Sequence, residues 1–215
     1  MIREKIISDN MMELIFPIPI YRTRRESNLD SSEKKDIEDI IKEGMHQGQA
    51  NSYTTNSYIF NTKLKNLKEF CEQHIENYAK QLISPKEEIN FYITQSWLTI
   101  TKAGEFHHPH FHRNSIISGV FYISTVEDDK IDFNILNYKP TATNIKIEPK
   151  EITPYNTEHW FLSVNTFDLL LFPSWLQHGV PPNEKATVDR ISLAFNTFVK
   201  GTLGSRENLT ELISQ

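Results

Sequence analysis

The chain has 215 residues, of which 38% are hydrophobic and 24% are charged, and its formal net charge is −5. This composition is ordinary for a globular protein, and without a basic stripe the sequence argues against a nucleic-acid or membrane partner. The single cysteine, Cys71, excludes an internal disulfide and a cysteine-rich metal site, and it favours a cytoplasmic protein.

The first part of the chain predicts one extended segment followed by two helices. Residues 14–21 (LIFPIPIY) read as a short strand that two prolines confine to a sheet edge. Residues 28–45 place apolar side chains at helical spacing, with Asp30 or one of the two serines after it as the N-cap. Residues 64–82 carry a second apolar stripe, which ends ahead of Ser84 and a proline.

From Asn90 onward, short runs rich in Ile, Phe, Tyr and Thr are separated by turn-forming residues. Two helices followed by several short strands predict a mainly β protein, a sandwich or barrel with the N-terminal helices packed on the outside. We expect a single domain over residues 1–215, with a helical lead-in (1–88), a β-barrel core (89–200) and a C-terminal tail (201–215). The expected strands are residues 90–101, 115–125, 130–138, 144–152, 167–175 and 190–200.

Half of the eight histidines lie within six consecutive positions, directly ahead of an apolar, β-branched run. Alternate residues of a strand share a face, so His110 and His112 should project together, with Cα atoms about 7 Å apart. Two imidazoles at that separation can reach one metal ion. His108 has the same parity and His107 the opposite one, while Pro109 argues against regular pairing in this stretch. For an isolated H-x-H pair, a polar loop without a metal is the alternative interpretation.

Two later stretches favour the metal site over the polar loop. His178 follows an apolar strand and a tight Pro-Ser turn, and it offers a third imidazole. Arg190 heads another apolar strand, with Ser192 two residues further on. A buried guanidinium needs an anionic partner, and a carboxylate matches its two-pronged geometry. A structural salt bridge or an outward-pointing side chain is the alternative for Arg190 alone.

Several other residues are weaker candidates. Asn196 shares the strand parity of Arg190, so it faces either the same pocket or solvent. Trp97, Trp160 and Trp175 line a substrate mouth or serve as ordinary core and rim aromatics. His159 is expected in a loop outside the metal shell.

Four stretches resemble the Fe(II)/2-oxoglutarate-dependent oxygenases, and within them the prolyl-hydroxylase-like oxygenases of phages and bacteria. These stretches occur in family order between Leu14 and Phe198, and they read LIFPIPIY, HPHFHRNSIISGVFYI, LLLFPSWLQHGVPPN and RISLAFNTF. The resemblance implies a double-stranded β-helix, the jelly-roll barrel of cupin-like proteins, with iron at one open end. For a phage-encoded chain the compartment would be the host cytoplasm.

The resemblance also implies roles for individual residues. The metal ligands would be three histidines: His110, His112 and His178. Arg190 and Ser192 would bind the distal carboxylate of 2-oxoglutarate, and Tyr122 matches a position whose hydroxyl helps to hold that carboxylate. Fe(II), 2-oxoglutarate and O2 would then hydroxylate a substrate, a prolyl or other peptidyl side chain or a small molecule, and yield succinate and CO2.

The chain departs from the wider superfamily at one ligand, because that superfamily has H-x-D where this chain has H-x-H. Three neutral imidazoles leave Fe(II) with a charge of +2 instead of +1 before the dianionic cosubstrate binds. Two alternatives therefore stay open: a three-histidine, cupin-like metalloenzyme that does not use 2-oxoglutarate, and a non-catalytic jelly-roll binding protein. The substrate and the oligomeric state are not predicted.

Overall fold

The computed structural model describes residues 17–86, 88–135, 148–154 and 156–214. Within these ranges the chain forms two antiparallel sheets, two α-helices and one short 3-10 helix, Ile59–Asn61. The prediction of a mainly β protein with flanking helices is confirmed. Neither described helix combines the length and the apolar character that a bilayer crossing requires.

The larger sheet carries the longest strands. Among the described residues its order is β1 (Tyr21–Arg24), β9 (Asp168–Pro173), β6 (Ile117–Ser124), β11 (Arg190–Leu203), β4 (Ile89–Thr101), β3 (Ser52–Thr54) and β2 (Met45–Gln47), with β12 (Leu212–Ser214) paired to the end of β11. The smaller sheet has the order β5 (His107–His110), β10 (Gln177–Val180), β7 (Lys130–Asn134) and β8 (His159–Ser163).

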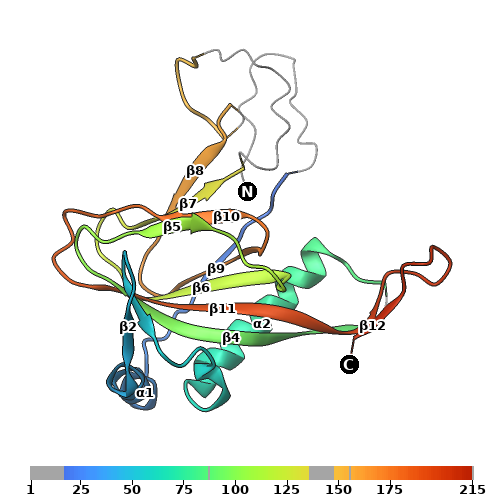
Figure 1. The fold of residues 1–215 in the computed structure, drawn as a ribbon, viewed down its shortest axis with the longest axis horizontal. Helices are drawn as coiled ribbons and strands as arrows, with labels where there is room; N and C mark the ends of the chain where they lie inside the picture. Colours follow the sequence, from blue (N-terminus) through green and yellow to red (C-terminus); the bar gives the residue numbers. More distant parts are fainter. Residues whose placement is uncertain (1–16, 87, 136–147, 155, 215) are drawn as a thin grey trace.

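Figure 1 shows the helices α1 (Ser31–Glu43) and α2 (Lys65–Leu82) on the side of the larger sheet that faces away from β5 and β10. The other face of the larger sheet and the inner face of the smaller sheet enclose a cavity, because side chains from β4, β6, β9 and β11 and from β5, β7 and β10 line it together. This cavity between the two sheets positions the site.

Helix α1 begins where the sequence predicts. The Asp30 Oδ1 atom accepts a hydrogen bond from the Glu33 backbone N–H at 2.8 Å, and the Glu33 carboxylate accepts one from the Asp30 N–H at 3.0 Å. This reciprocal capping box satisfies two N–H groups that the helix leaves without partners. The helix ends earlier than expected, because Gly44 has a φ of 143° and residues from Met45 onward form β2.

Helix α2 packs against β4 and β9 through the apolar stripe that the sequence predicts. Leu67 and Ile75 are at most 1% exposed, and each such aliphatic side chain contributes about 1.5–3 kcal/mol by its burial. The Cys71 thiol lies in the same stripe, and burial raises its pKa. Tyr78 donates a hydrogen bond to the Pro19 carbonyl at 2.7 Å, which fixes the segment before β1 on the helix.

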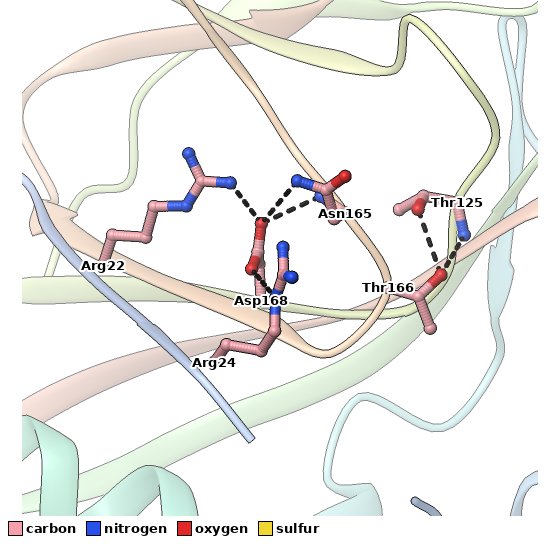
Figure 2. Close-up of polar contacts among 6 residues, drawn as sticks. All are labelled: Arg22, Arg24, Thr125, Asn165, Thr166 and Asp168. Atoms are coloured by element: carbon pink, nitrogen blue, oxygen red, sulfur yellow. Dashed lines mark hydrogen bonds and ion pairs between the residues drawn. The ribbon is translucent and has the colours of Figure 1, made fainter. Parts of the chain in front are cut away.

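Strand β1 is held at the edge of the larger sheet by a buried carboxylate. Asp168, the first residue of β9, is 1% exposed and accepts hydrogen bonds from Arg22, Arg24 and the Asn165 backbone, with the Arg24 Nε at 2.8 Å (Figure 2). Burial alone would raise the pKa of the Asp168 carboxyl, but these hydrogen bonds hold it below its ordinary value. Figure 2 also shows Thr125 bonded to Thr166 at 3.1 Å, beyond the carboxyl end of β6.

The structure corrects several predicted boundaries. The N-terminal strand was expected at residues 14–21, whereas β1 is Tyr21–Arg24; residues 17–20 are not in a strand and residues 14–16 lie outside the described ranges. No strand occupies the described part of residues 144–152, and the rest of that prediction also lies outside the described ranges.

Six strands were not expected from the sequence: β2, β3, β5, β8, β10 and β12. His159 is the first residue of β8, so its prediction as a loop residue is wrong. Residues 201–203 continue β11, and 212–214 pair with its end, so this part of the predicted C-terminal tail belongs to the larger sheet.

Candidate metal centre

Three histidines that are far apart in the sequence converge at the cavity. Pairing of β10 with β5 places His178 opposite His110, and their ring centroids are 4.4 Å apart. His112 follows β5 and is fixed by a hydrogen bond from its backbone N–H to the Ser174 carbonyl at 2.9 Å. One ring nitrogen of each histidine lies within 4.8 Å of the others, so one ion can contact all three imidazoles.

A β-bulge changes the orientation of the residues before His110. His110 pairs with His178 and His107 pairs with Val180, so two residues of β5 oppose Gly179 alone. A Cβ atom at Gly179 would lie 3.0 Å from the His107 carbonyl oxygen, which explains the glycine. Pro109 lies inside β5, and the pairing around it is irregular, as the sequence predicts; the residue is tolerated because β5 is an edge strand of the smaller sheet and a bulge accommodates the missing N–H.

The bulge also reverses the parity that simple alternation predicts. His107 lines the cavity and stacks on the His110 ring, with centroids 4.4 Å apart and planes 23° apart. His108 is exposed and contacts Phe106 instead. Simple alternation therefore does not hold before His110, the stretch in which Pro109 argued against regular pairing.

Backbone carbonyls fix the orientation of two of the three converging rings. The His110 Nδ1 atom lies 2.8 Å from the His108 carbonyl, and the His178 Nδ1 atom lies 2.9 Å from the Leu176 carbonyl. A carbonyl only accepts, so each Nδ1 carries the proton and each Nε2 keeps a free lone pair. The Nδ1 atom of His112 faces the Asn196 amide at 3.3 Å. In all three rings Nδ1 is occupied in this way, which leaves Nε2 as the nitrogen that could reach a metal.

Burial keeps the cluster uncharged. It lowers the pKa of His112 to about 4 and that of His178 to about 3, and repulsion from the neighbouring imidazoles adds to both shifts. Burial likewise lowers the pKa of His107 to about 4 and lowers that of His110. At neutral pH these rings are in the form that binds metals.

Arg190 lies in the same cavity with much of its hydrogen-bonding capacity unused. Its side chain is 5% exposed, and its Nη1 donates to the Lys130 carbonyl at 3.3 Å. Its Nε has no hydrogen-bond partner among the described residues. The described lining of this cavity contains no acidic side chain, whereas Arg190 also borders a smaller cavity that Glu105 and Asp129 line. These features fit a ligand that brings its own carboxylate.

The remaining predicted carboxylate-binding residues form one row across the larger sheet. Ser192 pairs with Tyr122 of β6 on one side and with Thr99 of β4 on the other, and all three line the cavity. Ser192 is 6% exposed and Tyr122 is 1% exposed, and burial raises the pKa of the Tyr122 hydroxyl. Hydroxyl donors therefore lie beside Arg190 along β11 and its neighbours. Thr99 was not singled out from the sequence.

The structure places some of the weaker candidates at the cavity and others away from it. Trp97 lines the cavity, with its ring centroid 5.9 Å from that of His112. Trp160 and Trp175 are not among the described lining residues. Asn196 is 6% exposed and is therefore not a surface amide. His159 lies 3.3 Å from the Asp132 carboxylate, outside the converging histidines.

The sequence matches the family model described as "Putative 2OG-Fe(II) oxygenase" over residues 95–196. That segment runs from β4 to β11 and contains every described residue that lines the cavity. No curated protein matches the sequence significantly.

Solved structures of similar fold include several oxygenases. A prolyl-4-hydroxylase from Pseudomonas putida is 12% identical, with a TM-score of 0.54 over 83% of this chain and 92% of its own. A Trichoplax adhaerens prolyl hydroxylase, solved with a hypoxia inducible factor peptide fragment, is 13% identical, with a TM-score of 0.55 over 83% of both chains. HygX from Streptomyces hygroscopicus, solved with nickel, 2-oxoglutarate and hygromycin B, is 10% identical, with a TM-score of 0.52 over 84% of this chain and 82% of its own. These likenesses confirm the predicted double-stranded β-helix.

Proposed function

We propose that the chain is a dioxygenase of the Fe(II)/2-oxoglutarate-dependent superfamily, which couples oxidation of an organic substrate to conversion of 2-oxoglutarate into succinate and CO2; the family-model match over residues 95–196 supports this proposal. The observation that carries this proposal is the convergence of three neutral imidazoles in the cavity that also holds a buried, incompletely paired guanidinium. The imidazoles are suited to a metal ion, and the guanidinium is suited to a carboxylate of 2-oxoglutarate.

His110, His112 and His178 are the proposed ligands of Fe(II). When bound, Fe(II) supplies the redox chemistry that activates O2. These three residues would hold the metal through their Nε2 atoms, and the Arg190 end of the cavity would be left to the cosubstrate. An open coordination side of this kind separates a catalytic metal site from a closed structural one.

Arg190 is the proposed partner of the distal carboxylate of 2-oxoglutarate, with hydroxyl groups of Ser192 and Tyr122 completing its environment. Two guanidinium N–H groups can donate in parallel to one carboxylate, which fixes the orientation of the ligand as well as its affinity. The keto acid end of the cosubstrate would then point toward the histidines. Phe172 and Ile131 contribute apolar surface to the lining of the same cavity.

The H-x-H pattern makes the proposed metal site more positive by one charge than an H-x-D site. This difference favours a dianionic cosubstrate by coulombic attraction, and in the buried cavity that attraction is less screened than in water. The same three-histidine set supports the second candidate, a cupin-like enzyme without 2-oxoglutarate. Arg190 distinguishes the two candidates, because only the first needs a carboxylate anchor.

We propose further that the reaction is hydroxylation, and that the substrate is either a prolyl or other peptidyl side chain or a small molecule. The fold likeness to two prolyl hydroxylases supports the peptide, and the likeness to HygX supports the small molecule. Trp97 lies beside His112, which supports binding of the substrate at the end of the cavity opposite Arg190. The single, buried thiol of Cys71 supports a cytoplasmic location.

The test is anaerobic loading with Fe(II), followed by addition of O2 and 2-oxoglutarate and quantification of succinate by mass spectrometry. Oxygenases of this mechanism turn over slowly without substrate, so succinate formation alone supports the reaction class. A His178→Ala protein with an unchanged circular dichroism spectrum is the control and should form none. Metal uptake without 2-oxoglutarate consumption would favour the cupin-like candidate, and no metal uptake would favour a non-catalytic protein.

A further inference from the structure

A chain of buried and half-buried polar side chains leads from His112 away from the cavity. The His112 Nδ1 lies 3.3 Å from the Asn196 Nδ2, and the Asn196 Oδ1 lies 2.8 Å from the Ser118 Oγ. The Ser118 Oγ lies 2.8 Å from the Ser174 Oγ, which lies 2.7 Å from the Ser115 Oγ. We call these four residues beyond the histidine (Asn196, Ser118, Ser174 and Ser115) the amide–serine chain.

Burying the polar groups of the amide–serine chain costs desolvation free energy, so its presence needs an explanation. Asn196, Ser118 and Ser174 are 6%, 2% and 0% exposed. Each unpaired polar group at such depth costs about 1–3 kcal/mol, and an apolar side chain of similar volume would avoid that cost. The chain differs from the supports of His110 and His178, whose Nδ1 atoms each bond a backbone carbonyl two residues earlier. His112 alone has its Nδ1 atom fixed by a side chain.

The hydrogen bonds of the amide–serine chain can run in either direction. In the first, the Asn196 amide N–H donates to His112 Nδ1, its oxygen accepts from Ser118, and each serine hydroxyl accepts from the next one. The proton of the neutral imidazole then sits on Nε2, where it blocks a metal. The Thr197 backbone N–H, 3.2 Å from the Ser115 Oγ, completes this direction at its far end.

In the second direction the Asn196 amide is turned over. Its oxygen accepts from His112 Nδ1–H, its N–H donates to Ser118, and each serine donates to the next. Ser115 ends this direction at the Ile117 carbonyl, 3.3 Å away. Every group is again paired, and the Nε2 lone pair of His112 is free for a metal.

We propose that Asn196 is a positioning residue that sets the tautomer of His112, and that the amide–serine chain reverses direction when the metal binds. This inference rests on the proposed function, because it assumes that His112 is a metal ligand. Residues that bond the far nitrogen of a ligand histidine typically affect metal affinity about 10–100-fold. Asn196 would act on the metal through His112 without touching it.

The first experiment measures Co(II) affinity of the full chain anaerobically, by its visible d–d absorption in competition with a chelator. Asn196→Leu removes the acceptor and should weaken Co(II) binding about 10–100-fold. Asn196→Asp keeps an acceptor for Nδ1–H and should bind within a few-fold of the wild type. Thr197→Val is the matched control: it is 0% exposed and bonds the Ile117 backbone, so it should lower the melting temperature without changing affinity.

A second experiment uses no variant and therefore does not depend on how a substituted chain folds. The 15N spectrum of the wild type with Zn(II) should show His112 protonated at Nδ1 and ligated at Nε2, and without metal it should show the proton on Nε2. Equal Co(II) affinity of Asn196→Leu and wild type, or the same His112 tautomer in both states, would overturn the inference and leave the proposed function intact. A wild type that binds no divalent metal would overturn both.

Discussion

Substitution of Arg190 by methionine should make the metal-free protein more stable while it impairs the binding of 2-oxoglutarate. The guanidinium is 5% exposed, makes one bond to a carbonyl at 3.3 Å and leaves its Nε without a partner among the described residues. A buried, unsatisfied polar group costs about 1–3 kcal/mol, and replacing a buried charge by an apolar side chain of similar volume removes that cost. In a domain of this size each kcal/mol corresponds to about 2–4 °C in melting temperature.

The same substitution removes the partner of the cosubstrate carboxylate. Loss of one partner from a buried, charged pair costs about 2–4 kcal/mol in binding, which is a Kd about 30- to 900-fold higher. Calorimetric titration of the Zn(II)-loaded protein with 2-oxoglutarate measures the affinity, because zinc fills the site without redox chemistry. Scanning calorimetry with a chelator present measures the stability of the metal-free form.

Arg24→Met is the matched control, because it removes an arginine that already has an anionic partner. The Arg24 Nε bonds Asp168 at 2.8 Å at the far edge of the larger sheet, so its loss should lower the melting temperature and leave 2-oxoglutarate affinity unchanged. The two arginine substitutions should therefore shift stability in opposite directions. An Arg190→Met protein that melts below the wild type and binds 2-oxoglutarate equally well would refute the reasoning.

Three further substitutions or conditions test other parts of the structure. Asp168→Ala removes the hydrogen bonds that hold β1 and should lower the free energy of unfolding by about 1–3 kcal/mol. The cost stays in this range because the half-exposed Arg22 and Arg24 can bond water instead. Urea denaturation should show the loss, with unchanged metal affinity. Gly119→Ala places a methyl group against the Phe195 ring in a close-packed wall and should cost about 1–3 kcal/mol or more; an unchanged denaturation midpoint would contradict this packing. The metal-free protein should lose stability as the pH falls from about 6.5 to 4, because the unfolded chain protonates near 6.5 while folded His112 resists protonation to about 4 and His178 to about 3. Melting temperatures at pH 7.5 and pH 5 with a chelator measure this dependence, and a flat profile would mean that these rings are not buried as neutral groups.

The elements that could be predicted from the sequence are those whose own residues encode a period. The apolar stripe of α2 repeats at helical spacing, and β4, β6, β9 and β11 are runs of five or more residues bounded by turn signals. Strands β2, β3 and β12 have three residues each, which is too short for any periodicity. Strands β3 and β12 pair with the longer strands β4 and β11, and β2 pairs with β3, so all three depend on backbone partners that only the tertiary structure supplies.

Some residues of the candidate site could likewise be predicted from the sequence, and others depend on the tertiary structure. Spacing alone suggested His110 and His112, and the apolar strands before His178 and from Arg190 suggested buried positions for those two. The cavity-facing orientation of His107 depends on the bulge opposite Gly179, which one strand read by itself does not reveal. The contact of Asn196 with a histidine 84 residues away depends on how β11 lies against the segment after β5.

The two arginines of β1 have a consequence for solubility as well as for folding. All six residues of β9 are buried, and its apolar stretch from Leu169 to Phe172 pairs with β6 on one side and with β1 on the other. Without β1, this apolar strand would present a bare row of backbone donors and acceptors to other molecules, the arrangement from which strand-to-strand aggregation starts. Because the carboxylate of Asp168 retains a short cationic strand over that row, we expect its loss to favour association of separate copies of the chain edge to edge.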